Sequence, residues 1–173
     1  MDAADTDSVR IRLRRARPGD ADDLARAWTD QAEVYAEIDP SLFAVPDEQG
    51  LGDWLVEGLT SQADPERRLV LVADVDGRAT GFIIAAVVPP HPAAERQMQR
   101  DVDDVSVRIE ALAVRRAWWH HGVGSRLTTA AEDWARNRGA TVITAQAHLD
   151  GPARGFFAAR GYAARAVVHA RTL

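Results

Sequence analysis

Two glycines, Gly122 and Gly124, are the residues of this chain whose type and spacing best suit ligand binding, because they fall where a turn should pass into a helix. The first turn of a helix has backbone N–H groups without partners and the positive end of the helix dipole, so it attracts phosphate groups. Glycine lets a phosphate approach this backbone closely. The turn therefore predicts a site for a phosphorylated ligand.

Two common nucleotide-binding motifs are excluded at this turn. The dinucleotide fingerprint needs a third glycine, which Ser125, Arg126 and Leu127 do not supply. The phosphate loop of nucleotide hydrolases needs a lysine, and the chain contains none. Glycine pairs also occur in strand–turn–helix units for packing alone, so a structural domain that binds nothing is an alternative hypothesis.

Length and composition limit the classes of protein. A chain of 173 residues is enough for one domain with its own core. The net charge of −5 disfavours nucleic acid as a partner, and the absence of cysteine excludes disulfides and a cysteine nucleophile. No apolar run approaches the roughly 20 residues of a membrane span. Residues 1–8 do not resemble a signal peptide. We expect a cytoplasmic protein without membrane contact, with a flexible tail (1–8) and a single domain (9–173).

Hydrophobic periodicity predicts strands that alternate with helices. Strands are expected at 9–13, 69–73, 80–88, 105–114, 141–147 and 162–173, and helices at 20–37, 51–59, 123–138 and 153–160. Asp76-Gly77 predicts a tight hairpin turn, and residues 89–104 predict a polar loop. This order indicates an α/β protein, a mixed sheet with helices on both faces.

The alternation of the fourth expected strand breaks near its end. Val107 and Ile109 share one face, but beyond Ala111 the apolar positions shift to Leu112 and Val114. An extra residue in a strand produces such a slip and bends the strand. The N–H and C=O groups left unpaired there could bind an amide-bearing ligand by strand-like pairing.

The bulged strand and the glycine turn together resemble motif A of the GNAT superfamily of N-acetyltransferases, which bind acetyl-CoA. That motif ends a strand in Leu-x-Val and opens a helix with Arg/Gln-x-x-Gly-x-Gly/Ala. Here Leu112-Ala113-Val114 ends the strand, and residues 119–124 fill the turn. Residues 150–162 are similar to the family segment Asn-x-x-Ala-x-x-Leu-Tyr-x-x-x-Gly-Phe, and residues 11–20 resemble its first strand and helix start. The resemblance covers residues 9–173 and implies the GNAT fold, with a bulged, splayed fourth strand.

The resemblance also implies how acetyl-CoA would bind. The backbone of Leu112 and Val114 would pair with the pantetheine arm. Backbone N–H groups at the helix start would hold the pyrophosphate, those of His121, Gly122, Val123, Gly124 and Ser125. A nearby arginine could meet the 3′-phosphate, the candidates being Arg115, Arg116 and Arg126. Alternatively, these arginines are solvated surface residues.

Two residues depart from the family pattern. Trp119 stands where the family has Arg or Gln, which removes a polar group beside the pyrophosphate. The turn can survive this change because its binding groups are mainly backbone. Phe157 stands where the family commonly has the tyrosine that protonates the leaving thiolate, and phenylalanine has no proton to give. Another group or water must then serve.

Acetyl transfer to an amine needs a base, because an amine is protonated at neutral pH. The resemblance makes Glu110 the first candidate, since family members often carry a catalytic glutamate at its position. His148, at a strand end, is the second. Alternatively, Glu110 pairs with Arg108 at the surface and His148 is merely exposed. The histidines form no metal-binding pattern, so no metal is expected.

The first helix and the loop after it would form the acceptor side in this family. Acidic and aromatic residues there would suit a cationic amine, unless the aromatic ones are core. These residues are Trp28, Glu33, Tyr35, Glu37, Asp39 and Phe43.

The resulting hypothesis is an acetyl-CoA-dependent N-acetyltransferase, with direct attack by a primary amine of an unidentified small molecule. The alternatives are a non-catalytic acyl-CoA-binding regulatory module and an acetyltransferase for a protein N-terminus or lysine. The apolar residues Ala166, Val167 and Val168 would leave the expected last strand as an exposed sheet edge. We therefore expect a homodimer through that strand.

Overall fold

The computed structural model describes residues 10–61, 64–99 and 101–171 of the chain. The expected tail, residues 1–8, lies outside the described residues. No helix in the described ranges is long and apolar enough to cross a membrane.

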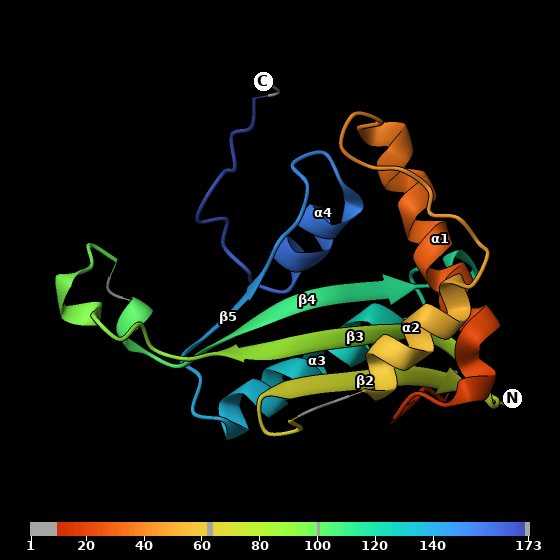
Figure 1. The fold of residues 1–173 in the computed structure, drawn as a ribbon, viewed down its shortest axis with the longest axis horizontal. Coiled ribbons are helices and arrows are strands. Elements are labelled where there is room, and N and C mark those ends of the chain that lie inside the picture. Colours follow the sequence, from red (N-terminus) through yellow and green to blue (C-terminus); the bar gives the residue numbers. More distant parts are fainter. Residues whose placement is uncertain (1–9, 62–63, 100, 172–173) are drawn as a thin grey trace, which may run out of the picture.

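A five-stranded mixed sheet forms the centre of the molecule (Figure 1). Its strands, neighbouring in chain order, are β1 (Arg12–Arg14), β2 (Arg68–Val75), β3 (Arg78–Val88), β4 (Ser106–Val114) and β5 (Val142–Ala145). The three pairs from β1 to β4 are antiparallel, and β5 runs parallel to β4. The expected α/β mixed sheet is confirmed.

Helices cover both faces of the sheet, as expected. They are α1 (Ala21–Ile38), α2 (Leu51–Thr60), α3 (Val123–Asn137) and α4 (Pro152–Ala159). In Figure 1, α2 crosses in front of the sheet and α3 runs behind it. Leu24 of α1 and Leu55 of α2 pack with Phe82 in one core, whereas Leu127 of α3 packs with Val107 in the other. Short 3-10 turns lie at Pro18–Asp20, Ala94–Arg96, Asp101–Asp103 and Arg116–Trp118.

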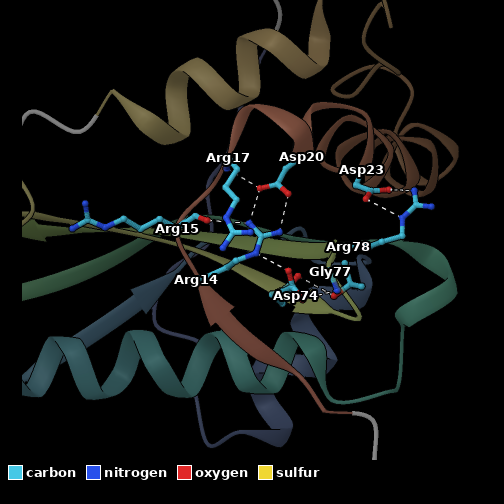
Figure 2. A network of polar contacts seen from close by, with 10 residues as sticks. Arg14, Arg15, Arg17, Asp20, Asp23, Asp74, Gly77 and Arg78 are labelled. Atoms are coloured by element: carbon cyan, nitrogen blue, oxygen red, sulfur yellow. Dashed lines mark hydrogen bonds and ion pairs between the residues drawn. The ribbon is translucent and has the colours of Figure 1, made fainter.

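A largely buried network of charges links β1 and the turn before α1 to the β2–β3 hairpin (Figure 2). Arg14 donates to Asp20 at 2.7 and 2.8 Å and to Asp74 at 2.6 Å. Burial raises the pKa of Asp20, but hydrogen bonds from Arg14 and from the Arg17 backbone outweigh it and hold this pKa below its usual value. The hairpin turns at Asp76 and Gly77, both with positive φ, as the Asp-Gly pair predicts.

The expected bulge in β4 is present. Ile84 of β3 faces Ala111, and the next residue of β3, Ala85, faces Ile109, so Glu110 is the extra residue. The insertion explains why Ile109 and Leu112 pack into the same core although three positions separate them.

The sheet opens beyond this bulge. β5 pairs with β4 only from Ser106 to Ile109, opposite Val142 to Ala145. The remaining part of β4, Glu110 to Val114, has β3 on one side and no paired strand on the other in the described chain. This opening is the splayed fourth strand that the resemblance implies.

The strand expected at 162–173 is wrong for the residues that the structure describes. Residues 162–171 have no regular secondary structure, and residues 172–173 lie outside the described ranges. Val167 and Val168 are exposed, and the segment passes α4 without lying along the sheet (Figure 1). The apolar run has strand composition, but a strand also needs a neighbour to pair with. The homodimer thus stays a prediction without the strand that suggested it.

Candidate functional site

The free edge of β4 presents backbone groups at the two residues expected to pair with a ligand. The Arg115 N–H donates to the Thr80 carbonyl at 2.9 Å, so the backbone of Arg115 faces β3. Successive residues of an extended strand direct their backbone groups to opposite sides, so those of Leu112 and Val114 point away from β3. They face the opening between β4 and β5.

The turn after β4 leads into α3 through a left-handed glycine. Gly122 has φ of 83° and immediately precedes the helix. The first intrahelical bond is from the Arg126 N–H to the Gly122 carbonyl, at 2.9 Å. The N–H groups of Val123, Gly124 and Ser125 therefore lie in the first turn, where a helix offers donors to an anion. No acidic residue lies in that turn to oppose an anion.

The strand edge and the helix start line one cavity of about 390 Å³. Six of the seven expected cofactor-binding residues line it or its rim, namely Leu112, Val114, Gly122, Val123, Gly124 and Ser125. The seventh, His121, does not line it. The His121 side chain is exposed, its Nδ1 lies 2.8 Å from the Trp119 carbonyl, and its N–H already faces the Trp118 carbonyl at 3.4 Å.

Trp119 has a role that the sequence does not indicate. Its indole N–H donates to the Val114 carbonyl at 2.7 Å. The same carbonyl is one of the groups that the strand edge offers to the cavity. The tryptophan therefore occupies one backbone acceptor of the free strand edge.

The three arginines expected near a phosphate differ in their surroundings. Arg115 pairs with Asp23 at 3.0 Å, and Arg116 pairs with Glu33 at 2.8 Å. Arg126, in the first turns of α3, is exposed and has no ion pair with a described residue. Of the three, only Arg126 carries a charge that no carboxylate of the described chain neutralises.

Glu110, the first candidate base, lies outside the cavity. It is the exposed bulge residue, and its carboxylate is 3.6 Å from the Arg68 guanidinium of β2. It does not pair with Arg108 in the described contacts, although a surface ion pair had been one expectation. Its catalytic role stays a prediction.

His148, the second candidate base, lies in a sheltered cluster. Its side chain is 18% exposed, its Nε2 is 3.5 Å from the Asp39 carboxylate, and its ring meets that of Phe43 edge-on. The Ser41 hydroxyl, more than His148 itself, holds the pKa of Asp39 below its usual value. Asp39 is thus an ionised group that can orient the imidazole.

The acceptor-side residues have different surroundings. Trp28 stacks on Phe82 at 5.9 Å and belongs to the core, as the alternative held. Tyr35 lines the cavity and packs against Phe43, with ring centroids 5.0 Å apart. Glu33 is engaged by Arg116, and Glu37 is exposed.

The aromatic residue at the family's tyrosine position is buried away from the cavity. Phe157 is 7% exposed, and its ring packs against Tyr162 and Phe156 in the core beside α3. Its neighbour Phe156 lines the cavity instead. A hydroxyl at position 157 would therefore be buried among apolar rings.

Sequence reasoning missed several residues that line the cavity. They are Gln31, Val34, Trp118, His120, Pro152, Ala153 and Phe156. Gln31 lies one turn before Tyr35 on α1 and could have been found from that spacing, whereas Val34 is the residue directly before Tyr35. The others depend on how α4 and the turn before α3 are placed.

The donor set suits an acyl-CoA better than a metal. No cluster of three or more His, Cys, Asp or Glu side chains that could hold a metal occurs in the described ranges. The free N–H groups of α3 suit a pyrophosphate, and the free edge of β4 suits the amides of a pantetheine arm.

Comparisons with known proteins agree with this architecture. A family model described as "Acetyltransferase (GNAT) family" matches residues 26–162. A mutant of the BH1408 protein from Bacillus halodurans aligns with TM-score 0.75 and 17% identity over 94% of this chain and 99% of that chain. Curated proteins yield no sequence match.

Two structural neighbours carry names of enzymes. An aminoglycoside acetyltransferase from an uncultured soil metagenomic sample, in complex with sisomicin, aligns with TM-score 0.53 and 19% identity, covering 94% of this chain and 96% of that chain. Glucosamine-6-phosphate N-acetyltransferase from Arabidopsis thaliana aligns with TM-score 0.59 and 11% identity, covering 94% and 98%. At these identities the likeness shows the fold alone.

Proposed function

The chain belongs to the GNAT acetyltransferase family, and we propose that it transfers the acetyl group of acetyl-CoA directly to a primary amine of a small molecule. The observation that supports this most is the joint placement of the free β4 edge and the first turn of α3 around one cavity. One side offers backbone partners for amides, and the other offers donors for phosphate. An extended ligand with both groups fits such a cavity.

In this proposal the chain's backbone holds the co-substrate. Val123, Gly124 and Ser125 donate to the pyrophosphate, and Leu112 and Val114 pair with the pantetheine arm. The N–H of His121 adds a donor once it leaves the Trp118 carbonyl. Arg126 supplies charge for the 3′-phosphate, because Arg115 and Arg116 are already paired. Acetyl-CoA itself contributes an activated thioester, so the protein's part is positioning and proton movement.

We propose His148 as the base, held by Asp39, with Glu110 as the alternative. His148 lies beside Phe43, which contacts the cavity residue Tyr35, whereas Glu110 faces Arg68. An imidazole can accept the proton of an ammonium near neutral pH. The ionised Asp39 beside it also favours a cationic acceptor.

Release of coenzyme A thiol in the presence of amines tests the proposal. The panel is sisomicin, glucosamine-6-phosphate, spermidine, tyramine and a peptide with a free N-terminus. The first two follow the names of structural neighbours, and the peptide tests the protein-acceptor alternative. We expect amine-dependent release with a small-molecule amine. Tight binding of acetyl-CoA without release for any amine would instead indicate the regulatory module.

A further inference from the structure

The proposed transfer releases a thiolate that must take up a proton. Position 157, where the family commonly has a tyrosine as proton donor, carries a phenylalanine. Phe157 has no acidic hydrogen, and its ring is fixed in the core between Phe156 and Tyr162. Protonation of the departing sulfur by a neighbouring acid assists cleavage of the carbon–sulfur bond. If a protein group rather than water supplies this proton, the group must belong to another element that reaches the cavity.

Tyr35 of α1 is the one phenol on the cavity wall. Among the residues that line the cavity, only Tyr35 and His120 have titratable side chains, and His120 is exposed at the outer turn. Tyr35 is 9% exposed and shares the cavity with Leu112 and Val114, the strand residues proposed to hold the pantetheine arm. Its phenol therefore lines the same cavity as the strand edge along which the arm is proposed to run.

The Tyr35 ring packs against the start of α4. A Cβ on Gly151 would lie 2.6 Å from the ring carbon Cε1 and 3.1 Å from the hydroxyl oxygen, so the ring rests directly against this glycine. Burial raises the pKa of Tyr35, and the Ala153 N–H, which interacts with the oxygen, partly opposes this. The hydroxyl donates no hydrogen bond to a described residue, so its proton is available.

We infer that Tyr35 is the catalytic acid of the transfer, in place of the missing tyrosine at position 157. The inference rests on the proposed acetyl transfer. The oxygen that loses the proton lies at the N-terminus of α4, where the Ala153 N–H and the helix dipole stabilise the negative charge left on it. The phenylalanine at position 157 then does not deprive the site of a proton donor, because the donor hydroxyl is on α1 instead of α4.

The protons and bonds balance as follows. The ammonium first loses one proton to solvent through His148. The neutral amine nitrogen then bonds to the acetyl carbon, and the carbon–sulfur bond breaks. His148 takes the second proton that the nitrogen loses, and Tyr35 gives its hydroxyl proton to the sulfur. Water then returns the proton from His148 to Tyr35, which leaves the amide and the free thiol as products.

Titration of the bound coenzyme A thiol tests this contact without any acceptor. A hydroxyl that donates to the sulfur stabilises the thiolate and lowers the pKa of the thiol. In Tyr35→Phe, we expect the pKa of bound coenzyme A, followed by thiolate absorbance, to rise by about one unit. The dissociation constant for coenzyme A at neutral pH and the Tm should stay close to those of the wild type, because the ring packing is kept.

Turnover provides the second readout, with the best amine of the panel. Tyr35→Phe should lower kcat about 100-fold with little change in the KM for acetyl-CoA. Gly151→Ala keeps the hydroxyl but displaces it, so kcat should also fall. The matched control is Tyr162→Phe, which removes the only other tyrosine hydroxyl, bonded to Glu132 at 3.1 Å and remote from the cavity wall. It should change neither readout.

The outcomes separate this inference from the proposed function. An unchanged thiol pKa in Tyr35→Phe overturns the acid role. If the wild type acetylates an amine and Tyr35→Phe has the same kcat, the acid role is overturned as well. Both results leave the acetyltransferase proposal intact. A raised thiol pKa in Tyr35→Phe with no wild-type turnover for any amine supports the contact between Tyr35 and sulfur but overturns the proposed transfer.

Discussion

The two walls of the β4–β5 opening are built in different ways. The wall proposed to hold the cofactor comes from one continuous segment, residues 112–125, and offers backbone N–H and C=O groups. The opposite wall uses side chains from separate segments. Tyr35 of α1 lines the cavity, whereas Asp39 and His148 adjoin it through Phe43 and do not line the cavity themselves. A wall of backbone groups keeps its hydrogen-bonding atoms when a side chain changes, as at Trp119, where the family has Arg or Gln. A wall of side chains loses its reactive groups when those side chains change. Substitutions on the first wall should therefore change binding, and those on the second should change turnover.

The largest expected effect on binding comes from Gly124→Asp. A Cβ at Gly124 would meet the Phe156 ring at 3.5 Å, an ordinary contact, so the fold tolerates a side chain there. The carboxylate would repel the pyrophosphate and block its approach. Loss of two charge-assisted hydrogen bonds corresponds to a weakening of about 100-fold or more, so thermal stabilisation by acetyl-CoA should disappear.

Gly58→Asp is the control for this substitution. Gly58 is exposed on α2 and has open space around it, so the variant adds the same charge away from the cavity. It should keep the full thermal shift with acetyl-CoA. If Gly124→Asp keeps it too, the glycine turn is not the phosphate site.

Beside the second wall, His148→Asn should lower kcat/KM by roughly 10²–10⁴ while acetyl-CoA binding is unchanged. Asparagine keeps the approximate size but cannot take up the proton. Glu110→Gln, measured in the same amine assay, should have little effect because Glu110 faces Arg68. The reverse pattern would return the role of base to Glu110, and loss of cofactor binding in His148→Asn would break the division between the walls.

Arg126→Gln should weaken acetyl-CoA binding about fivefold, the size expected for one exposed charge pair. The substitution should not change the affinity for 3′-dephospho-coenzyme A, because this ligand lacks the 3′-phosphate that Arg126 is proposed to bind. Arg136→Gln, at the other end of α3 and paired with Asp133, is the control. An equal loss for both ligands in a calorimetric titration would show that Arg126 does not meet the 3′-phosphate.

The smallest expected effect is a gain in affinity for acetyl-CoA. Trp119→Phe removes the indole N–H that occupies the Val114 carbonyl, so the pantetheine arm no longer competes for it. One net hydrogen bond of about 1 kcal/mol corresponds to roughly fivefold tighter binding of acetyl-CoA. Trp134→Phe, remote from the cavity, should leave the affinity unchanged. Weaker binding in Trp119→Phe would mean that the indole itself helps to hold the ligand.

The wall built from one continuous segment could be predicted from the sequence, because its signals lie close together along the chain. The slip from Ile109 to Leu112 predicts a bulge, and the two glycines mark a helix start, because both signals lie within a few neighbouring residues. The structure has both features, with the extra residue at Glu110. The helices and the first five strands also follow from local periodicity, apart from small shifts of their ends.

Contacts between distant segments could not be predicted in this way. Nothing near Tyr35 in the sequence indicates that Gly151 leaves room for its ring, or that His148 lies beside Asp39. Val167 and Val168 have strand composition, but residues 162–171 pair with no strand of the sheet, although the outer edge of β5 has no partner in the described chain, so the expected last strand is absent there. Side-chain type is local information, whereas pairing depends on the whole fold.

Amide hydrogen exchange with and without acetyl-CoA tests the central claim most directly, namely that one continuous stretch of backbone holds the ligand. We predict that added acetyl-CoA slows exchange at Leu112, Val114, Val123, Gly124 and Ser125, and that Gly124→Asp abolishes this protection. Unchanged exchange at these five amides under saturating acetyl-CoA would contradict the account. So would protection confined to the separate hollow lined by Arg10, Arg12 and Asp74.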